Sequence, residues 1–240
     1  MRVAGLQKRL AQDVSVVYER IASVFPVTYE PRRFHVETWV KKLSEATAPI
    51  GVHHELEWDI TQATQQLGTS GIWYPKTELP ANRSMADVRL IWYCNPTNRT
   101  VKLSKKQWHV RRFYCFSMMM HELIHRYQDE ANVTPRVYRA QTDMVKERDQ
   151  QWYYGSTDEI ETNGFQTAME CLIWWPTDTL QSALQNALTY PNATYARYWK
   201  TFAGCRSHPA VRHYRRKIEQ WYDVMTQNRA FYDSLELVSM

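Results

Sequence analysis

Apolar residues recur at three- and four-residue steps along most of the chain, and this spacing predicts a largely helical protein. The first helix is expected over residues 2–25, where one face carries Val3, Leu6, Leu10, Val14, Val17, Ile21 and Val24. Further helices are expected over residues 36–46, 156–175, 179–188, 195–202 and 209–237, and another begins at residue 105. Residues 132–150 are expected to form a polar connection that can be partly helical.

A short β-structure is predicted just before the helix that begins at residue 105. Residues 88–94 are rich in β-branched and aromatic side chains, residues 95–98 give a turn signal, and residues 100–103 alternate like a partner strand. We therefore expect a β-hairpin here. Residues 55–67 are ambiguous, and residues 68–80 are expected to form a loop because of their glycines and prolines. The predicted fold class is α+β, mostly helical, as one domain over residues 1–240.

Composition excludes several classes of protein. The chain has 240 residues, of which 44% are hydrophobic and 23% charged, which is typical of a globular domain. With 7 glycines and no Gly-rich phosphate loop, nucleotide-binding folds of that type are not expected. No apolar run or signal-peptide core is present, so we expect a cytoplasmic location and no membrane partner. The four cysteines are scattered, which indicates reduced thiols and no cysteine-type zinc ribbon.

The formal net charge of +5 permits an acidic partner without requiring one. A basic cluster in the last predicted helical region comprises Arg206, Arg212, Arg215, Arg216 and Lys217. It could bind nucleic acid or an acidic protein surface. Alternatively, it is a solvated helix face that pairs with Glu219 and Asp223.

The strongest chemical signal is the H-E-x-x-H motif formed by His121, Glu122 and His125. On a helix, residues four apart share a face, so both imidazoles can reach one metal ion. Glu122 lies beside that face and could act as the general base of a zinc-activated water. A catalytic Zn²⁺ needs a third protein ligand and an open position. The similar run His53-His54-Glu55 lacks the second histidine and is interpreted as structural.

The third metal ligand is expected to be a glutamate from the helix that begins near residue 156. Glu161 shares a face with Gly164 and Phe165, which predicts a core-facing carboxylate that needs a metal or a partner. Gly164 would let this helix approach the histidine helix closely. Glu159 lies on a polar face and, with Ser156, fits a capping box. We therefore predict Glu161 as the ligand, with Glu159 as the alternative.

Residues 88–175 resemble small gluzincin-type zinc metallopeptidases, in particular the SprT-like and ImmA/IrrE-like families and related phage-encoded proteins. Besides the histidine motif, Glu159-Ile-Glu161-Thr-Asn163-Gly-Phe165 is similar to the acidic helix E-x-E-A-N-x-F of those families, with Thr162 where alanine is usual. The resemblance implies a minimal zincin fold, a bound Zn²⁺ and hydrolysis of a peptide or protein substrate. Residues 1–87 and 176–240 would then be flanking helical regions.

The same resemblance leaves a second class of function open. A zincin fold could be retained as a structural or interaction module without turnover, for example in a phage virion or as a regulatory component. If the chain is an active peptidase, an extended substrate could add to the exposed edge of the strand at residues 88–94 or 100–103.

Overall fold

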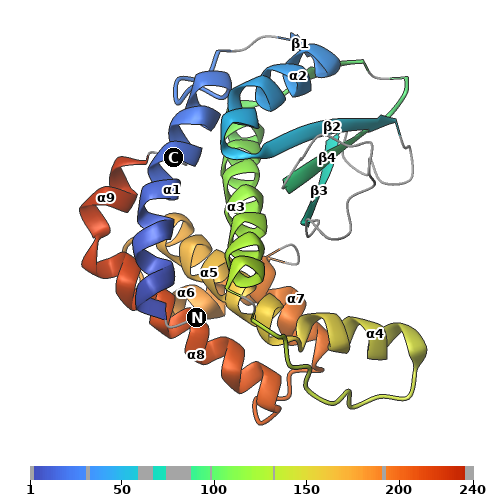
Figure 1. Ribbon diagram of the computed structural model, residues 1–240, viewed down its shortest axis with the longest axis vertical. Coiled ribbons are helices and arrows are strands. Elements are labelled where there is room, and N and C mark those ends of the chain that lie inside the picture. Colours follow the sequence, from blue (N-terminus) through green and yellow to red (C-terminus); the bar gives the residue numbers. More distant parts are fainter. Residues whose placement is uncertain are drawn as a thin grey trace. The chain divides into compact units, whose positions relative to one another are not determined.

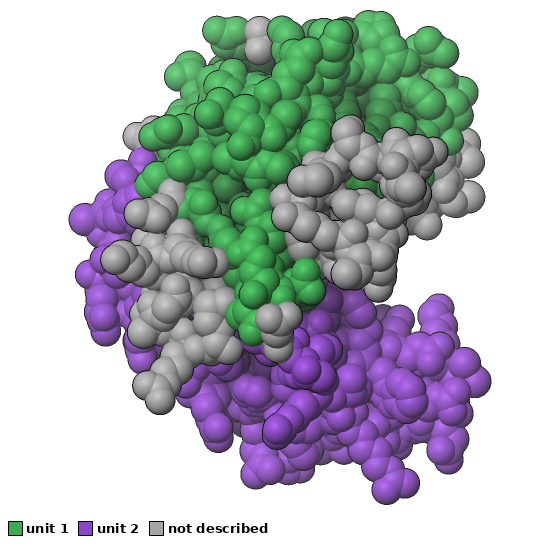
Figure 2. Space-filling view, viewed as in Figure 1, with its two compact units in different colours: residues 1–131, 235–240 green, residues 132–234 purple. Residues whose placement is uncertain are grey.

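The computed structural model describes residues 3–30, 33–58, 67–73, 88–97, 99–131, 133–190 and 193–235. The chain divides into two compact units (Figure 2). Unit 1 comprises residues 1–131 and 235–240, and unit 2 comprises residues 132–234. The organisation of the whole chain as one domain stays a prediction.

Unit 1 combines three long helices with short strands (Figure 1). Its elements are α1 (Val3–Val24), β1 (Arg33–His35), α2 (Val36–Thr47), a 3-10 turn η1 (Ala48–Ile50), β2 (Val52–Trp58), β3 (Leu67–Trp73), β4 (Val88–Cys94), β5 (Thr100–Lys102) and α3 (Lys105–Glu130). Within this unit, α1 lies along one side of α3 and the strands β2, β4 and β3 lie on the other. The helices predicted over residues 2–25 and 36–46 are confirmed as α1 and α2.

The sheet of unit 1 corrects the predicted hairpin. β4 is the central strand, parallel to β2 and antiparallel to β3, and β5 pairs with β1 instead of β4. Six of the seven residues of β4 are buried, which fits a strand with a neighbour on each side. β4 therefore has no open edge for an added peptide. The loop predicted over residues 68–80 is wrong for residues 68–73, which form most of β3, and residues 74–80 lie outside the described residues.

The helix that carries the histidine motif, α3, starts at a capping box and is anchored by a buried face. Ser104 Oγ accepts a hydrogen bond from the backbone N–H of Gln107 at 3.2 Å, and Gln107 Oε1 accepts from the N–H of Ser104 at 2.9 Å. Farther along the helix, Met120, Leu123 and Ile124 are all at most 1% exposed. This apolar face fixes the rotation of α3 and so leaves His121 and His125 partly exposed.

The regular secondary structure in the described residues of unit 2 is helical, apart from an isolated β-bridge. Its helices are α4 (Val145–Tyr154), α5 (Thr157–Trp174), α6 (Leu180–Leu188), α7 (Thr194–Thr201), α8 (Pro209–Gln227) and α9 (Arg229–Ser234). The helix predicted over residues 209–237 is interrupted at Asn228, which divides it into α8 and α9. α5 and α8 form the most extensive helix pair of the unit.

Gly164 permits the close approach of α5 to α8. A Cβ atom at Gly164 would lie 2.8 Å from the Cβ of Lys217 and 3.5 Å from the backbone nitrogen of Ile218. The next residue, Phe165, packs edge-on against Trp221, which lies one turn after Lys217 on α8, with ring centroids 5.3 Å apart. The prediction that Gly164 marks a close helix contact is confirmed for α8. The expectation that the neighbour is the histidine helix is not what these contacts show.

The fold class is α+β and mostly helical, as predicted. Three of the four cysteines are buried, and all four are free thiols: Cys94, Cys115, Cys171 and Cys205. Across the part of the chain that the structure describes, no helix is long and apolar enough to span a bilayer.

Candidate metal site

The two motif histidines face each other on α3 with a separation suited to one metal ion. Nε2 of His121 and Nε2 of His125 lie 3.2 Å apart, and the ring planes meet at 75°. Two nitrogen ligands bound at about 2.0–2.1 Å to a tetrahedral zinc ion are about 3.3 Å apart. The pair therefore already has the spacing of one edge of a zinc tetrahedron.

Gln128 fixes the protonation of His125. Its Oε1 lies 3.0 Å from His125 Nδ1. A carboxamide oxygen can only accept, so Nδ1 is the donor, and the neutral form of this imidazole has its lone pair on Nε2. A histidine that ligates a metal through Nε2 commonly donates its other N–H to such a partner. Gln128 is 8% exposed, which shields this hydrogen bond from water.

Glu159, in the first turn of α5, is a buried carboxylate held in place by its own helix. It is 7% exposed, and the Nδ2 group of Asn163 donates to its Oε2 at 3.0 Å. The same Nδ2 group donates to the Glu159 backbone carbonyl at 2.8 Å, and Thr162 Oγ1 donates to that carbonyl at 3.1 Å. These contacts hold Oε2 and the backbone carbonyl of Glu159 in place.

The capping box predicted for Ser156 and Glu159 does not form. Ser156 is the N-cap residue of α5, but its hydroxyl donates to the carboxylate of Asp158, and no side-chain cap bond is present. Glu159 therefore does not take part in capping the start of α5, which is the role that the sequence suggested. The face it shares with Thr162 and Asn163, interpreted from sequence as the polar one, is buried.

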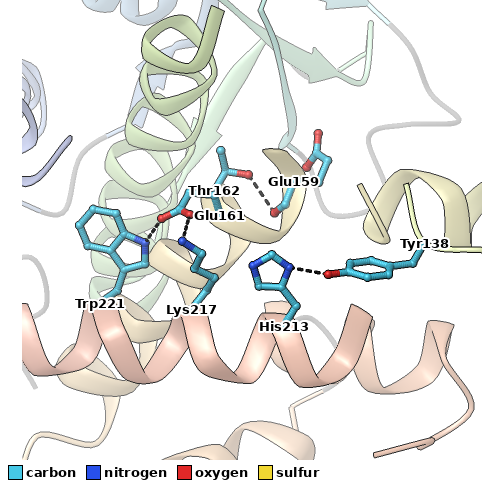
Figure 3. Close-up of polar contacts among 7 residues, drawn as sticks. All are labelled: Tyr138, Glu159, Glu161, Thr162, His213, Lys217 and Trp221. Carbon is cyan, nitrogen blue, oxygen red and sulfur yellow. Dashed lines mark hydrogen bonds and ion pairs between the residues drawn. The ribbon is translucent and has the colours of Figure 1, made fainter. Parts of the chain in front are cut away.

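Glu161 is engaged by α8. Trp221 Nε1 donates to its Oε1 at 2.8 Å, and Lys217 forms an ion pair with its Oε2. Figure 3 shows the Glu161 carboxylate turned toward these two residues and the Glu159 side chain pointing away from α8. The sequence predicted that the Glu161 carboxylate needs either a metal ion or a charged partner. Within unit 2 it has a charged partner, Lys217.

His213 on α8, four residues before Lys217, is hydrogen-bonded to Tyr138. Nδ1 of His213 is 2.8 Å from the hydroxyl of Tyr138 (Figure 3). Burial lowers the pKa of His213, and the positive charge of Lys217 lowers it further. The imidazole is therefore neutral near pH 7 and can accept the phenolic hydrogen.

Among the described residues, one group of side chains could hold a metal ion: His121, His125 and Glu159. Each can offer one ligand atom; His121 and His125 belong to unit 1 and Glu159 belongs to unit 2. The carboxylate grouped with the imidazoles is thus that of Glu159. Lys217 and Trp221 occupy both oxygens of Glu161, which favours the alternative that the sequence left open, Glu159, as the candidate third ligand.

The sequence analysis did not identify Gln128 and Asn163 as residues that position the side chains of the candidate site. Gln128 follows His125 by three positions, and Asn163 follows Glu159 by four, so both pairs are neighbours on one helix face. That spacing is the signal that could have found them.

The run His53-His54-Glu55 lies on β2 and serves the core, as interpreted from the sequence. His54 Nδ1 accepts a hydrogen bond from Trp92 Nε1 at 2.8 Å. Burial, followed by the charge of the adjacent His53, lowers the pKa of His54 to about 3, so this imidazole is neutral under ordinary conditions.

Comparison of the chain with protein-family models, with curated proteins and with solved structures gives no match. The resemblance to gluzincin-type metallopeptidases therefore stays a prediction based on the motif residues.

Proposed function

We propose that this protein binds one Zn²⁺ through His121, His125 and Glu159 and hydrolyses a peptide bond of a peptide or protein substrate. The observation that carries the proposal is the pair of imidazoles whose Nε2 atoms lie 3.2 Å apart. The hydrogen bond between His125 Nδ1 and Gln128 supports it because a neutral imidazole that donates from Nδ1 carries its lone pair on Nε2. A zincin-type fold in the SprT-like or ImmA/IrrE-like sense is part of the same proposal.

Glu122 is the proposed general base. It directly follows His121 on α3 and is 7% exposed. Zinc, when bound, polarises the scissile carbonyl and brings the pKa of an attacking water toward ~7. The Glu122 carboxylate takes the proton of that water and passes it to the leaving amine, so no proton is lost to solvent.

Metal analysis tests the binding step. The purified protein should contain about one zinc ion per chain, and H121A should lose it. H53A, which removes a histidine from β2, is the matched control and should keep the metal. A proton shared between the two Nε2 atoms could hold the rings in the same geometry without metal. Zinc content that is equal in wild type and H121A would support that simpler arrangement and end the proposal.

Turnover is tested separately with E122Q. This isosteric change should abolish cleavage of an internally quenched peptide library while zinc content stays at the wild-type level. If the wild-type protein holds zinc but cleaves no more of the library than E122Q does, a metal-binding module without turnover replaces the peptidase.

A further inference from the structure

The segment from Thr179 to Ile218 is free of acidic residues. At the average of the chain, with 25 acidic residues in 240, a stretch of 40 residues would contain about four. The same segment contains seven basic residues: Arg197, Lys200, Arg206, Arg212, Arg215, Arg216 and Lys217. Its positive charge is therefore not balanced along the sequence.

The fold of unit 2 brings two parts of this segment together. The guanidinium of Arg206, in the loop before α8, lies 5.4 Å from the ring centroid of Trp199 on α7. Burial raises the pKa of Tyr195 on α7, and the nearby charges of Arg215 and Arg206 oppose that rise. The loop arginine and the helix arginine therefore both lie near Tyr195.

Three of the arginines are neighbours on the surface of α8. Arg212, Arg215 and Arg216 have the three- and four-residue spacing of one helix face. Arg212 and Arg216 are exposed and Arg215 is partly exposed. Together with the exposed Arg206, these residues are called the α8 arginine cluster below.

Among the residues that the structure describes, the arginines of the cluster do not form the ion pairs with Glu219 and Asp223 that an ordinary solvated helix face would have. Glu219 lies four residues after Arg215 and is exposed, but within the described part of the chain no ion pair joins it or Asp223 to the cluster. Lys217 differs, since Glu161 neutralises it. The cluster thus presents four guanidinium groups without an acidic partner among the described residues.

We propose that the α8 arginine cluster binds the phosphodiester backbone of a nucleic acid. Guanidinium groups form paired hydrogen bonds with phosphate oxygens, and backbone contacts need no base recognition. No large hydrophobic side chain is exposed among the described residues of α7, α8 and the loop between them. The exposed ones of unit 2 lie elsewhere along the chain, at Val137, Met144, Val145, Trp152, Tyr153 and Tyr190. A protein interface needs an apolar centre and a lipid surface favours inserted apolar groups, so both are disfavoured relative to nucleic acid.

Fluorescence anisotropy with a labelled DNA duplex of about 20 base pairs, and with its single strand, tests the proposal. We expect binding at about 50 mM salt that weakens steeply toward about 200 mM. In R212E/R216E, affinity should fall at least about tenfold, and the slope of log K against log salt should shrink by about 2. R212Q/R216Q removes the same two charges without adding acids and should give the same loss of slope.

The matched control is K41E/K42E, which changes net charge equally at two exposed lysines of α2. It should bind DNA within about twofold of wild type. Equal losses in the two charge-reversal variants would show that net charge alone drives binding and would overturn the proposal. Absence of binding at low salt would do the same. Displacement of the DNA by polyglutamate at equal charge would instead assign the cluster to an acidic protein. E122Q should bind DNA normally, so this result is independent of the peptidase proposal.

Discussion

Glu170 makes the stability of unit 2 depend on pH near neutrality. This carboxylate lies on α5, is 2% exposed, and caps the start of α7 from another helix. The backbone N–H of Thr194 donates to its Oε2 at 3.1 Å, and Thr194 Oγ1 donates to its Oε1 at 2.8 Å. The N-cap residue itself, Ala193, has no side-chain oxygen to offer.

Burial raises the pKa of Glu170 from 4.5 to about 7, although hydrogen bonds from Thr194 oppose the rise. The folded state therefore binds a proton more tightly than the unfolded state. The stabilisation of the folded state by protonated Glu170 is complete below about pH 4.5 and is lost as the pH rises through about 7. A pKa difference of this size corresponds to about 3 kcal/mol in the free energy of unfolding.

Urea unfolding of wild type and E170Q at several pH values between about 5 and 8 measures this effect. Glutamine keeps the shape of the side chain and an oxygen for the Thr194 N–H but does not titrate. Relative to E170Q, wild type should lose about 2–3 kcal/mol between pH 5 and 8, while the exposed-site control E147Q should track wild type. A difference between wild type and E170Q that is constant over this range would refute the reasoning.

Two further substitutions test the packing of α5 and the orientation of the candidate ligand. G164A should destabilise the protein by about 1–3 kcal/mol in urea unfolding, because the new methyl group would overlap Lys217. A gain in stability, as expected for glycine to alanine at an open helix position, would contradict the close contact. N163A should weaken zinc binding by about 10- to 100-fold in chelator competition because it frees the Glu159 carboxylate. T162A removes only a bond to the Glu159 carbonyl and should change zinc affinity by less than about threefold, so equal losses in both variants would argue against a positioning role.

Local patterns in the sequence were sufficient for several elements. Helical periodicity predicted α1, α2 and α5 closely, and β-branched and aromatic composition predicted β4 at its observed bounds. The face of α3 that carries His121 and His125 also follows from spacing, because a helix places residues four apart side by side. These features depend on backbone geometry and local burial, which neighbouring residues determine.

Strand pairing and the different surroundings of the two glutamates depend on contacts between residues far apart in the sequence. β4 pairs with β2 and β3, and not with β5, because a strand bonds whichever edge the fold brings to it. The sequence context favoured Glu161, because it placed Glu159 on a polar face that the fold in fact buries. Lys217 on α8, more than fifty residues later, neutralises Glu161 and leaves Glu159 as the candidate ligand. Periodicity predicts the helix and its most apolar face, but only the tertiary structure shows which polar residues are also buried and which charged group lies opposite them.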